Sequence, residues 1–423
     1  MMRKLRWYGL SLAFLLAAGL MFSGPGAPSL LAQAKPIKIG FTMPLTGGLS
    51  VGGKAALVAI KIWAEDVNAK GGLLGRQVKL VYYDDHTKSA DIPQLYAKLI
   101  DVDKVDFVVS SYGSLLIAPA MPTVIERKMV FLSLFGNAMN APYNYKYYFQ
   151  IMPAGPRAMV DQFGGFFTVA SQVDPKPKTV ALVGVDHEFG VKCLEGARET
   201  AAKYGFKVIY DERYPPGTTD LTPVARKIKA LNPDMVFVAS YPPDSVAMVR
   251  ASKEVGLKPK LFGGGMVGLQ FTTIQQTLGP TLNGILNYWF WVPEPTLKFP
   301  GIEAFLKKYQ ARARKEGVDP LGYYLPPWAY AYVQVLGQAI QATKSLDQAT
   351  VGEYIRANEF DTVVGKVKFA PNGEWARPRT LMVQIQNVKS NDLSEFSKPG
   401  KQVVIYPKKF KSGKLIYPFP GWE

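Results

Sequence analysis

Two polar turns, each directly after a short apolar run, hold the residues of this chain whose types and spacing suit ligand chemistry. Val105–Val109 leads into the turn Ser110–Ser114, and Val130–Leu134 leads into the turn Phe135–Asn137. Apolar runs of this length are typical of parallel strands buried on both faces. Ligands of open α/β sheets bind at the carboxyl edge of such strands, because loop amides and helix N-termini direct their N–H groups there. We therefore expect the two turns to form one wall of a small-ligand cleft.

The segments that must position these turns alternate between strand and helix patterns. Strands are expected at Ile37–Met43 and Gln77–Tyr83, with a helical pattern at Ile92–Val102. After a break rich in Pro, Tyr and Asn at Ala141–Pro156, the alternation begins again and continues to a glycine-rich turn at Gly263–Gly265. Alternation of this kind indicates doubly wound parallel sheets. The pattern predicts an α/β protein with two such units.

The last third of the chain changes character. Two long helices are expected at Ile302–Lys315 and Trp328–Lys344, and we assign both to the first lobe because their apolar faces need a sheet. Pro371–Gly373 is a strong hairpin turn signal between two strand patterns. The tail from Lys401 is rich in lysine and is expected to form a basic extended arm over the surface.

The first 34 residues have the pattern of a secretory signal peptide. Arg3, Lys4 and Arg6 form a basic head, Tyr8–Phe22 is apolar, and Ala32-Gln33-Ala34 suits a cleavage site. The apolar run is shorter than the ~20 residues that a membrane span needs. We expect cleavage after Ala34 and a periplasmic location.

Composition excludes several function classes. The chain has 423 residues, is 48% hydrophobic and carries a net charge of +17, but its lysines are scattered and form no stripe suited to nucleic acid. Cys193 is the only cysteine, and we expect it to be a buried small hydrophobe. His86 and His187 lack metal-ligand spacing, so no metal site is expected. No nucleotide fingerprint follows the first strand and no credible catalytic set is present, which argues against a nucleotide-dependent enzyme, so neither a cofactor nor enzymatic activity is expected.

Six segments in sequence order resemble the periplasmic leucine/isoleucine/valine-binding proteins, the type I solute-binding receptors of ABC importers. They are IKIGFTMPLTGGLSVGG, WAEDVNAKGGLLGR, YYDDHTKSADIPQLYAKLI, VVSSYGSLLIAPAMPTVIERKMVFLS, ALVGVDHEFG and MVFVASYPPDSVAMVRASKEVGLKPKLFGG. The resemblance implies two doubly wound α/β lobes joined by three hinge crossings, near Met152, Tyr288 and Asp361, and a cleft that closes on its ligand. The implied division is 1–34 signal peptide, 35–153 plus 288–361 lobe one, 154–287 plus 362–399 lobe two, and 400–423 basic C-terminal extension.

The resemblance also implies which residues hold the ligand. Main-chain N–H groups and hydroxyls of the first-lobe turns receive a carboxylate, at positions that fall on Ser114, Phe135 and Asn137 here. Amides fixed by a strand can receive a desolvated carboxylate without a side-chain entropy cost. The predicted ligand-binding residues are Tyr112, Ser114, Phe135, Gly136 and Asn137 in lobe one, with Phe189, Tyr241 and Gly265 in lobe two.

This chain departs from the family pattern where an acid would pair with a ligand ammonium. That position falls on Gly265, and a family tyrosine is replaced by Phe189. An unpaired buried ammonium is strongly disfavoured, although Asp186, Glu188 or Asp244 could supply the missing acid. We therefore expect a carboxylate without an amine, either an aromatic or phenylpropanoid-type acid or a medium-length aliphatic acid.

Three functions stay open at this point. The first is a monomeric receptor that delivers a small carboxylate to an ABC permease in the membrane. The second is a branched-chain or other amino acid binding protein of the same family. The third, from another class, is a ligand-sensing domain for a membrane regulator.

Overall fold

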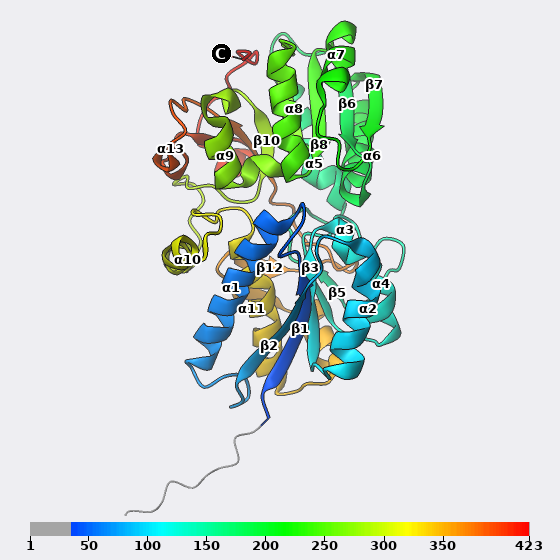
Figure 1. The fold of residues 1–423 in the computed structure, drawn as a ribbon, viewed down its shortest axis with the longest axis vertical. Helices are drawn as coiled ribbons and strands as arrows, with labels where there is room; N and C mark the ends of the chain where they lie inside the picture. The colour runs from blue at the N-terminus through cyan, green and yellow to red at the C-terminus, as the bar shows by residue number, and fades with distance from the viewer. Residues whose placement is uncertain (1–34, 423) are drawn as a thin grey trace, which may run out of the picture. The chain divides into compact units, whose positions relative to one another are not determined.

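The computed structural model of this protein describes residues 35–422, and the predicted signal peptide at 1–34 lies outside the described residues. Pro36–Glu423 form one unit. Within it the strands gather into two large sheets, one in each lobe, with helices on both faces (Figure 1). The predicted α/β class with two doubly wound lobes is confirmed.

The first lobe is built on a five-stranded parallel sheet in the order β2-β1-β3-β4-β5. Helices α1 and α11 lie on one side of this sheet, and α2 and α4 lie on the other (Figure 1). Coverage of both faces explains why the inner strands β1, β3 and β4 are buried almost throughout, whereas the edge strand β2 is mostly part-exposed. The strands are β1 (Ile37–Met43), β2 (Val78–Asp84), β3 (Phe107–Tyr112), β4 (Phe131–Leu134) and β5 (Tyr148–Gln150). The helices are α1 (Ser50–Asn68), α2 (Ile92–Ala97), α3 (Ser114–Ile117), α4 (Met121–Glu126), α10 (Ile302–Glu316), α11 (Pro326–Thr343) and α12 (Gln348–Ala357).

The second lobe is built on a seven-stranded sheet in the order β14-β13-β10-β9-β8-β6-β7. The five strands from β10 to β7 are parallel, whereas β13 pairs antiparallel with β10 and β14 pairs antiparallel with β13. The strands are β6 (Thr179–Val185), β7 (Lys207–Tyr214), β8 (Met235–Ser240), β9 (Leu261–Met266), β10 (Leu286–Trp289), β13 (Leu381–Ile385) and β14 (Gln402–Tyr406). The helices are α5 (Ala158–Ala170), α6 (Glu188–Lys203), α7 (Thr222–Leu231), α8 (Pro242–Glu254), α9 (Thr272–Leu278) and α13 (Leu393–Ser397).

Three segments carry the chain between the two sheets. The first follows β5, the second follows β10, and the third lies between Trp375 and β13. The first and third crossings lie side by side, because Arg379 N–H donates to Pro153 O at 2.8 Å. The third crossing comes later than the predicted Asp361, since Asp361 belongs to β11 (Glu359–Thr362), which pairs with β12 (Gly365–Lys368).

The predicted hairpin around Pro371–Gly373 is only partly correct. Gly373 has φ +84°, as a tight turn requires, and the turn closes an isolated bridge between Phe369 and Trp375. The following strand β13 instead joins the second sheet between β10 and β14. All five residues of β13 are buried, and a strand of that kind needs a neighbour on each side rather than an exposed hairpin partner.

The C-terminal segment is part of the second lobe rather than a separate arm. Its strand β14 forms one edge of the sheet, and Phe419 and Trp422 pack against Phe262 with ring centroids 6.2 and 5.2 Å away. Lys408 and Lys409 remain exposed. The predicted basic surface is present, but the chain that carries it is anchored by apolar contacts.

The described residues also bear on the other sequence-based expectations. Cys193 is buried in α6, and burial raises the pKa of its thiol, as expected of a small hydrophobe. Between residues 35 and 422 no helix combines the length and apolar character of a membrane span. The same residues contain no group of three or more His, Cys, Asp or Glu side chains arranged to hold a metal ion.

Candidate functional site

The two predicted polar turns meet at the carboxyl edge of the first-lobe sheet. Ser114 begins α3 directly after β3, and Phe135–Asn137 follow β4. Ser114 Oγ accepts a hydrogen bond from Asn137 N–H at 2.8 Å, so the turns are joined. Tyr112 ends β3 beside them. The structure therefore brings Tyr112, Ser114, Phe135, Gly136 and Asn137 together, and all five are buried.

The main-chain donors of this wall already have acceptors within the protein. Phe135 N–H donates to Gln150 Oε1 at 3.1 Å, and Asn137 N–H donates to Ser114 Oγ. The amide nitrogen of Gln150 in turn donates to Gly136 O. These bonds differ from the expectation that the main-chain amides of Phe135 and Asn137 are open to a carboxylate. The polar group left without a partner in this turn is the side-chain amide of Asn137.

Phe135 holds a strained conformation that directs its ring toward the other aromatic residues. Its φ is +68°, in the left-handed region that bulky residues rarely adopt and that costs on the order of 1–3 kcal/mol. The ring packs against Phe290, Tyr324 and Trp328, with centroids 5.0, 5.4 and 6.0 Å away. Together with the hydrogen bond to Gln150, these contacts hold the Phe135 backbone in this conformation. Such strain is typical of ligand-binding sites, where surrounding contacts hold it in place.

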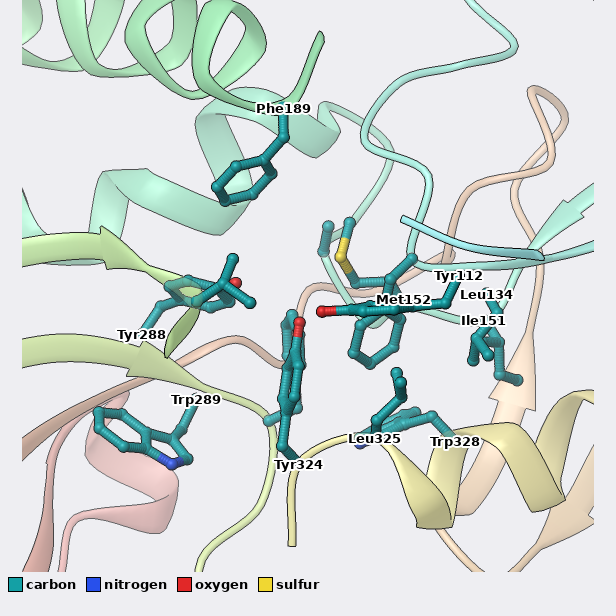
Figure 2. Packing of buried hydrophobic residues seen from close by; sticks show 14 of the residues in the cluster. Tyr112, Leu134, Ile151, Met152, Phe189, Tyr288, Trp289, Tyr324, Leu325 and Trp328 are labelled. Carbon is teal, nitrogen blue, oxygen red and sulfur yellow. The ribbon is translucent and has the colours of Figure 1, made fainter. Parts of the chain in front are cut away.

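Four tyrosines from the two lobes direct their hydroxyl groups toward one another, and we call Tyr112, Tyr241, Tyr288 and Tyr324 the tyrosine cluster. Tyr112 and Tyr324 come from lobe one, and Tyr241 and Tyr288 from lobe two. Figure 2 shows the hydroxyl oxygens of Tyr112, Tyr288 and Tyr324 converging. Burial raises the pKa of all four hydroxyls well above 10, and the neighbouring tyrosines raise it further. All four therefore stay protonated at neutral pH and can donate hydrogen bonds.

Phenylalanine rings enclose the tyrosine cluster. Phe189 at the start of α6 packs on Tyr241 with ring centroids 5.3 Å apart, and Phe271 packs on Tyr324 at 5.1 Å. The second contact joins the lobes, because Phe271 belongs to lobe two and Tyr324 to lobe one. Trp289, by contrast, points to the other side of β10 from Tyr288 (Figure 2), as successive strand residues must.

Three side chains at the facing edges of the two lobes carry buried polar atoms without a hydrogen-bond partner. They are the Asn137 amide, the Tyr241 hydroxyl and the Gln270 amide, in residues that are 1%, 8% and 2% exposed. Gln270 neighbours the hydroxyl of Tyr288, and the Tyr241 hydroxyl lies next to Leu115 in α3. A buried polar group left unpaired costs about 1–3 kcal/mol, which a ligand that supplies the missing bond can recover. We call the tyrosine cluster together with Asn137 and Gln270 the inner site.

Gly265 lies within a strand, not in the turn that the sequence predicts. Gly263–Gly265 belong to β9, and Gly265 pairs with Ala239 of β8. A Cβ atom at Gly264 would lie 2.3 Å from a ring carbon of Phe237, so glycine lets the strand pass this ring. The position expected to hold an acid thus carries no side chain. The residue of this segment that neighbours the tyrosine cluster is Gln270, in the short helix Val267–Gln270 that follows β9.

The three acids that could replace the missing one are engaged or exposed. Asp244 in the first turn of α8 accepts hydrogen bonds from Tyr214 O–H and Tyr241 N–H, and burial raises the pKa of Asp244 to about 6. Asp186 is exposed and forms an ion pair with Arg213 at 3.1 Å. Glu188 is exposed at the start of α6. Of the three, Asp244 alone is buried next to a member of the tyrosine cluster.

A cavity adjoins the inner site, and we call it the outer chamber. Its volume is about 520 Å³. On the lobe-one side it is lined by Leu49 and Leu115. On the lobe-two side it is lined by the 216–222 loop and by the face of α8 that bears Ala247. Tyr241 lines the chamber as well as the inner site. This residue therefore stands between the two spaces.

The ligand-binding residues predicted from the sequence do not include Gln270, Phe271 or Tyr324. Each lies outside the simple pattern of a polar turn directly after a buried strand. The signal that could have found Tyr324 is the aromatic pair Tyr323-Tyr324 before Pro326 at the start of α11. No comparable signal marks Gln270, because only folding of the loop after β9 brings it to the cluster.

Comparisons with known proteins agree with this architecture. A family model described as periplasmic binding protein matches residues 36–391. A leucine-, isoleucine-, valine-, threonine- and alanine-binding protein of Pseudomonas aeruginosa is 25% identical, over 82% of this chain and 90% of its own. The Leu/Ile/Val-binding protein of Escherichia coli strain K12 is 22% identical, over 81% of this chain and 89% of its own.

Solved structures with the same fold include proteins with different ligands. The leucine-binding protein LivK of Thermotoga maritima superposes with a TM-score of 0.72 at 21% identity, covering 83% of this chain and 96% of its own. A solute-binding protein of an ABC transporter from R. palustris, in complex with 4-hydroxybenzoate, superposes with a TM-score of 0.74 at 19% identity, covering 92% and 98%.

The matched family and these relatives are binding proteins, which confirms the expectation that the chain is not an enzyme. The predicted resemblance to leucine/isoleucine/valine-binding proteins is confirmed as well. The chain belongs to the periplasmic binding protein family.

Proposed function

We propose that this protein is a periplasmic receptor of an ABC importer and that it binds a small aromatic carboxylic acid between its two lobes. The observation that carries the proposal is the inner site, where aromatic rings and neutral hydrogen-bond donors of both lobes meet. The hydroxyls of the tyrosine cluster and the free amides of Asn137 and Gln270 suit a carboxylate or a phenol. The rings of Phe135 and Phe189 suit the flat face of an aromatic ligand.

The absence of an available acid in the inner site supports an acid ligand without an amine. A buried ammonium needs a carboxylate partner. Asp244, the buried acid next to the cluster, already accepts from Tyr214 and Tyr241. Solute-binding proteins of this fold from R. palustris hold benzoate and 4-hydroxybenzoate, which supports the same ligand class here.

Binding proceeds by closure of the lobes over the ligand. The first-lobe residues Asn137 and Tyr112 receive the acid, and Tyr241 and Gln270 then approach it from lobe two. The ligand shifts the equilibrium toward the closed form only through contacts that it makes better there. Residues from both lobes in one site therefore couple binding to closure. A permease in the membrane would recognise the closed form, and the binding protein itself would act as a monomer.

Isothermal titration of the purified protein tests this proposal. The protein is first unfolded in denaturant, dialysed and refolded, so that any carried ligand is removed. Benzoate and 4-hydroxybenzoate are titrated beside leucine and a dicarboxylate at one pH and salt concentration. We expect micromolar or tighter binding of an aromatic acid and no heat from leucine. Submicromolar binding of leucine, without a response to aromatic acids, would reject the aromatic ligand.

An amino acid receptor is the second candidate, and two observations favour it. The curated relatives named above bind branched-chain amino acids. Asp244 is buried, lines the outer chamber and neighbours Tyr241, so it is the acid placed to meet an ammonium group. Replacement of Asp244 by Asn distinguishes the candidates. The change would abolish binding of an amino acid and leave binding of an aromatic acid almost unaltered.

A further inference from the structure

The outer chamber is larger than an acid with a single ring requires. Its volume of about 520 Å³ lies inside the ~300–1,000 Å³ range of small-molecule pockets. It adjoins the inner site at Tyr241, which lines the chamber together with Leu115, the residue next to the Tyr241 hydroxyl. An extension of a ligand bound at the inner site would enter the chamber past Tyr241.

The wall of the chamber is mainly apolar. Leu49 and Leu115 from lobe one face Leu221, Val246 and Ala247 from lobe two. Burial of a ligand methylene against such a wall is favourable by about 0.8 kcal/mol, which corresponds to about a threefold to fourfold gain in affinity. The chamber thus offers an apolar surface against which an alkyl or aryl extension of a ligand would pack.

The charged groups at the chamber do not suit a second carboxylate. Asp220 and Glu254 line it beside Arg250, and all three are exposed. Both signs of charge are therefore present at the rim. Burial lowers the pKa of His187, so this side chain is neutral at pH 7 and adds no positive charge. The anionic end of a ligand is therefore better placed among the donors of the inner site.

We propose that the outer chamber is the second compartment of the ligand site, and that the preferred ligand is an aromatic acid with an apolar extension. This inference rests on the proposed function and adds the length of the ligand to it. The carboxylate or phenol end lies among the tyrosine cluster, Asn137 and Gln270. The extension passes Tyr241 and packs against Leu49, Leu115 and Ala247. Tyr241 thus contacts both parts of the ligand.

A series of ligands and one pair of variants test the two-compartment site. Benzoate, 4-ethylbenzoate and 4-butylbenzoate are titrated into the wild-type protein and into the Ala247→Phe variant. Ala247 is part-exposed on α8 and lines the chamber, so the added ring fills the chamber at little cost to folding. Ala202→Phe, at an exposed position near the end of α6, is the matched control. Val246→Phe repeats the test from the neighbouring position if Ala247→Phe folds poorly, as judged by thermal unfolding.

We expect the affinity of the wild-type protein to rise at least tenfold from benzoate to 4-butylbenzoate. Ala247→Phe should remove that gain and change the affinity for benzoate by less than about twofold, and Ala202→Phe should change neither. Equal effects of Ala247→Phe on both acids, or no effect on either, would overturn the inference and leave the aromatic-acid proposal standing. Failure of all three acids to bind the wild-type protein would instead reject the proposed function, and this inference with it.

Discussion

The facing edges of the two lobes meet the cleft in different ways. In lobe one, the main-chain donors at Phe135 and Asn137 are bonded to Gln150 and Ser114, so the edge is tied together from within. In lobe two, the Tyr241 hydroxyl and the Gln270 amide have no partner. The difference indicates that the main chain of the first-lobe wall is fixed and that side chains of both lobes carry recognition, the Asn137 amide on lobe one and the Tyr241 hydroxyl and Gln270 amide on lobe two. The carboxyl edges of two sheets can therefore differ: main-chain N–H groups are hydrogen-bonded within the protein at the first, and side-chain polar groups have no partner at the second.

The strongest way to break the first-lobe wall is Gln150→Leu. Gln150 Oε1 accepts from the N–H groups of Phe135 and Met152, and the change would leave both donors buried without an acceptor. At about 1–3 kcal/mol for each lost partner, we expect the free energy of unfolding to fall by about 3 kcal/mol or more in urea denaturation. Gln94→Leu, at an exposed position in α2, is the control and should change it by less than about 0.5 kcal/mol. Equal stability of the two variants would show that Gln150 does not hold the turn.

Gly52→Val would keep the two edges apart. A Cβ at Gly52 would lie 2.6 Å from Tyr112 Cε1 and 3.2 Å from Phe271 Cζ, where the lobes touch. We expect the affinity for an aromatic acid to fall at least tenfold in calorimetric titration, because the closed form becomes strained. Lys54→Val, at an exposed position of the same helix, should bind as the wild type does. Unaltered binding by Gly52→Val would argue against closure at this contact.

Two variants that each remove one oxygen atom, Ser114→Ala and Tyr241→Phe, distinguish a hydroxyl that stabilises the fold from a hydroxyl that binds the ligand. Ser114→Ala removes the acceptor of Asn137 N–H, so we expect a loss of about 1–3 kcal/mol in the free energy of unfolding. Tyr241→Phe removes a hydroxyl that has no partner in the protein, so stability should be retained while ligand affinity falls about fivefold. Urea denaturation and calorimetric titration of both variants check the contrast. The reverse pattern would assign recognition to the first-lobe wall.

The smallest expected effect concerns the pH dependence of stability at Asp244. Its folded-state pKa of about 6 lies above the ordinary value of 3.8 because the carboxyl is buried. The stability contributed by the protonated group is therefore complete below pH 3.8 and is lost as the pH rises through about 6. Between pH 5 and pH 7.5 we expect the free energy of unfolding to fall by about 1 kcal/mol more in the wild type than in Asp244→Asn. Urea denaturation of both proteins at the two pH values measures the difference, and parallel pH dependence would contradict the assignment.

Sequence patterns predicted the features of the fold that depend on regular strand and helix periodicity. The alternation of strands and helices, the two lobes, and the meeting of Ser114 with Phe135–Asn137 all follow from apolar runs ending in polar turns. The strand β13 lies in lobe two as predicted, but its neighbours are β10 and β14 and not the predicted hairpin partner, because strand pairing across a long loop depends on which strand offers a free, buried neighbour. A local turn signal at Pro371–Gly373 says nothing about that choice.

The candidate site was predictable only in part, for the same reason. Tyr112 and Tyr241 lie at strand ends, where position in the sequence indicates position in the cleft. Gln270 and Tyr324 reach the tyrosine cluster from loops that are far apart in the sequence, and only the packing of the two lobes brings them together. The hydrogen bonds of Gln150 could not be read from the sequence either, since they depend on a side chain from a different strand.

A crystal structure with the aromatic acid that titration shows to bind most tightly tests the central claim most directly. We predict that the polar end of the acid lies within hydrogen-bonding distance of the Tyr241 hydroxyl and the Gln270 amide, with its ring against Phe135. The bonds from Phe135 N–H to Gln150 and from Asn137 N–H to Ser114 should remain. An acid bound instead to those two main-chain N–H groups, with Tyr241 and Gln270 out of contact, would contradict the account.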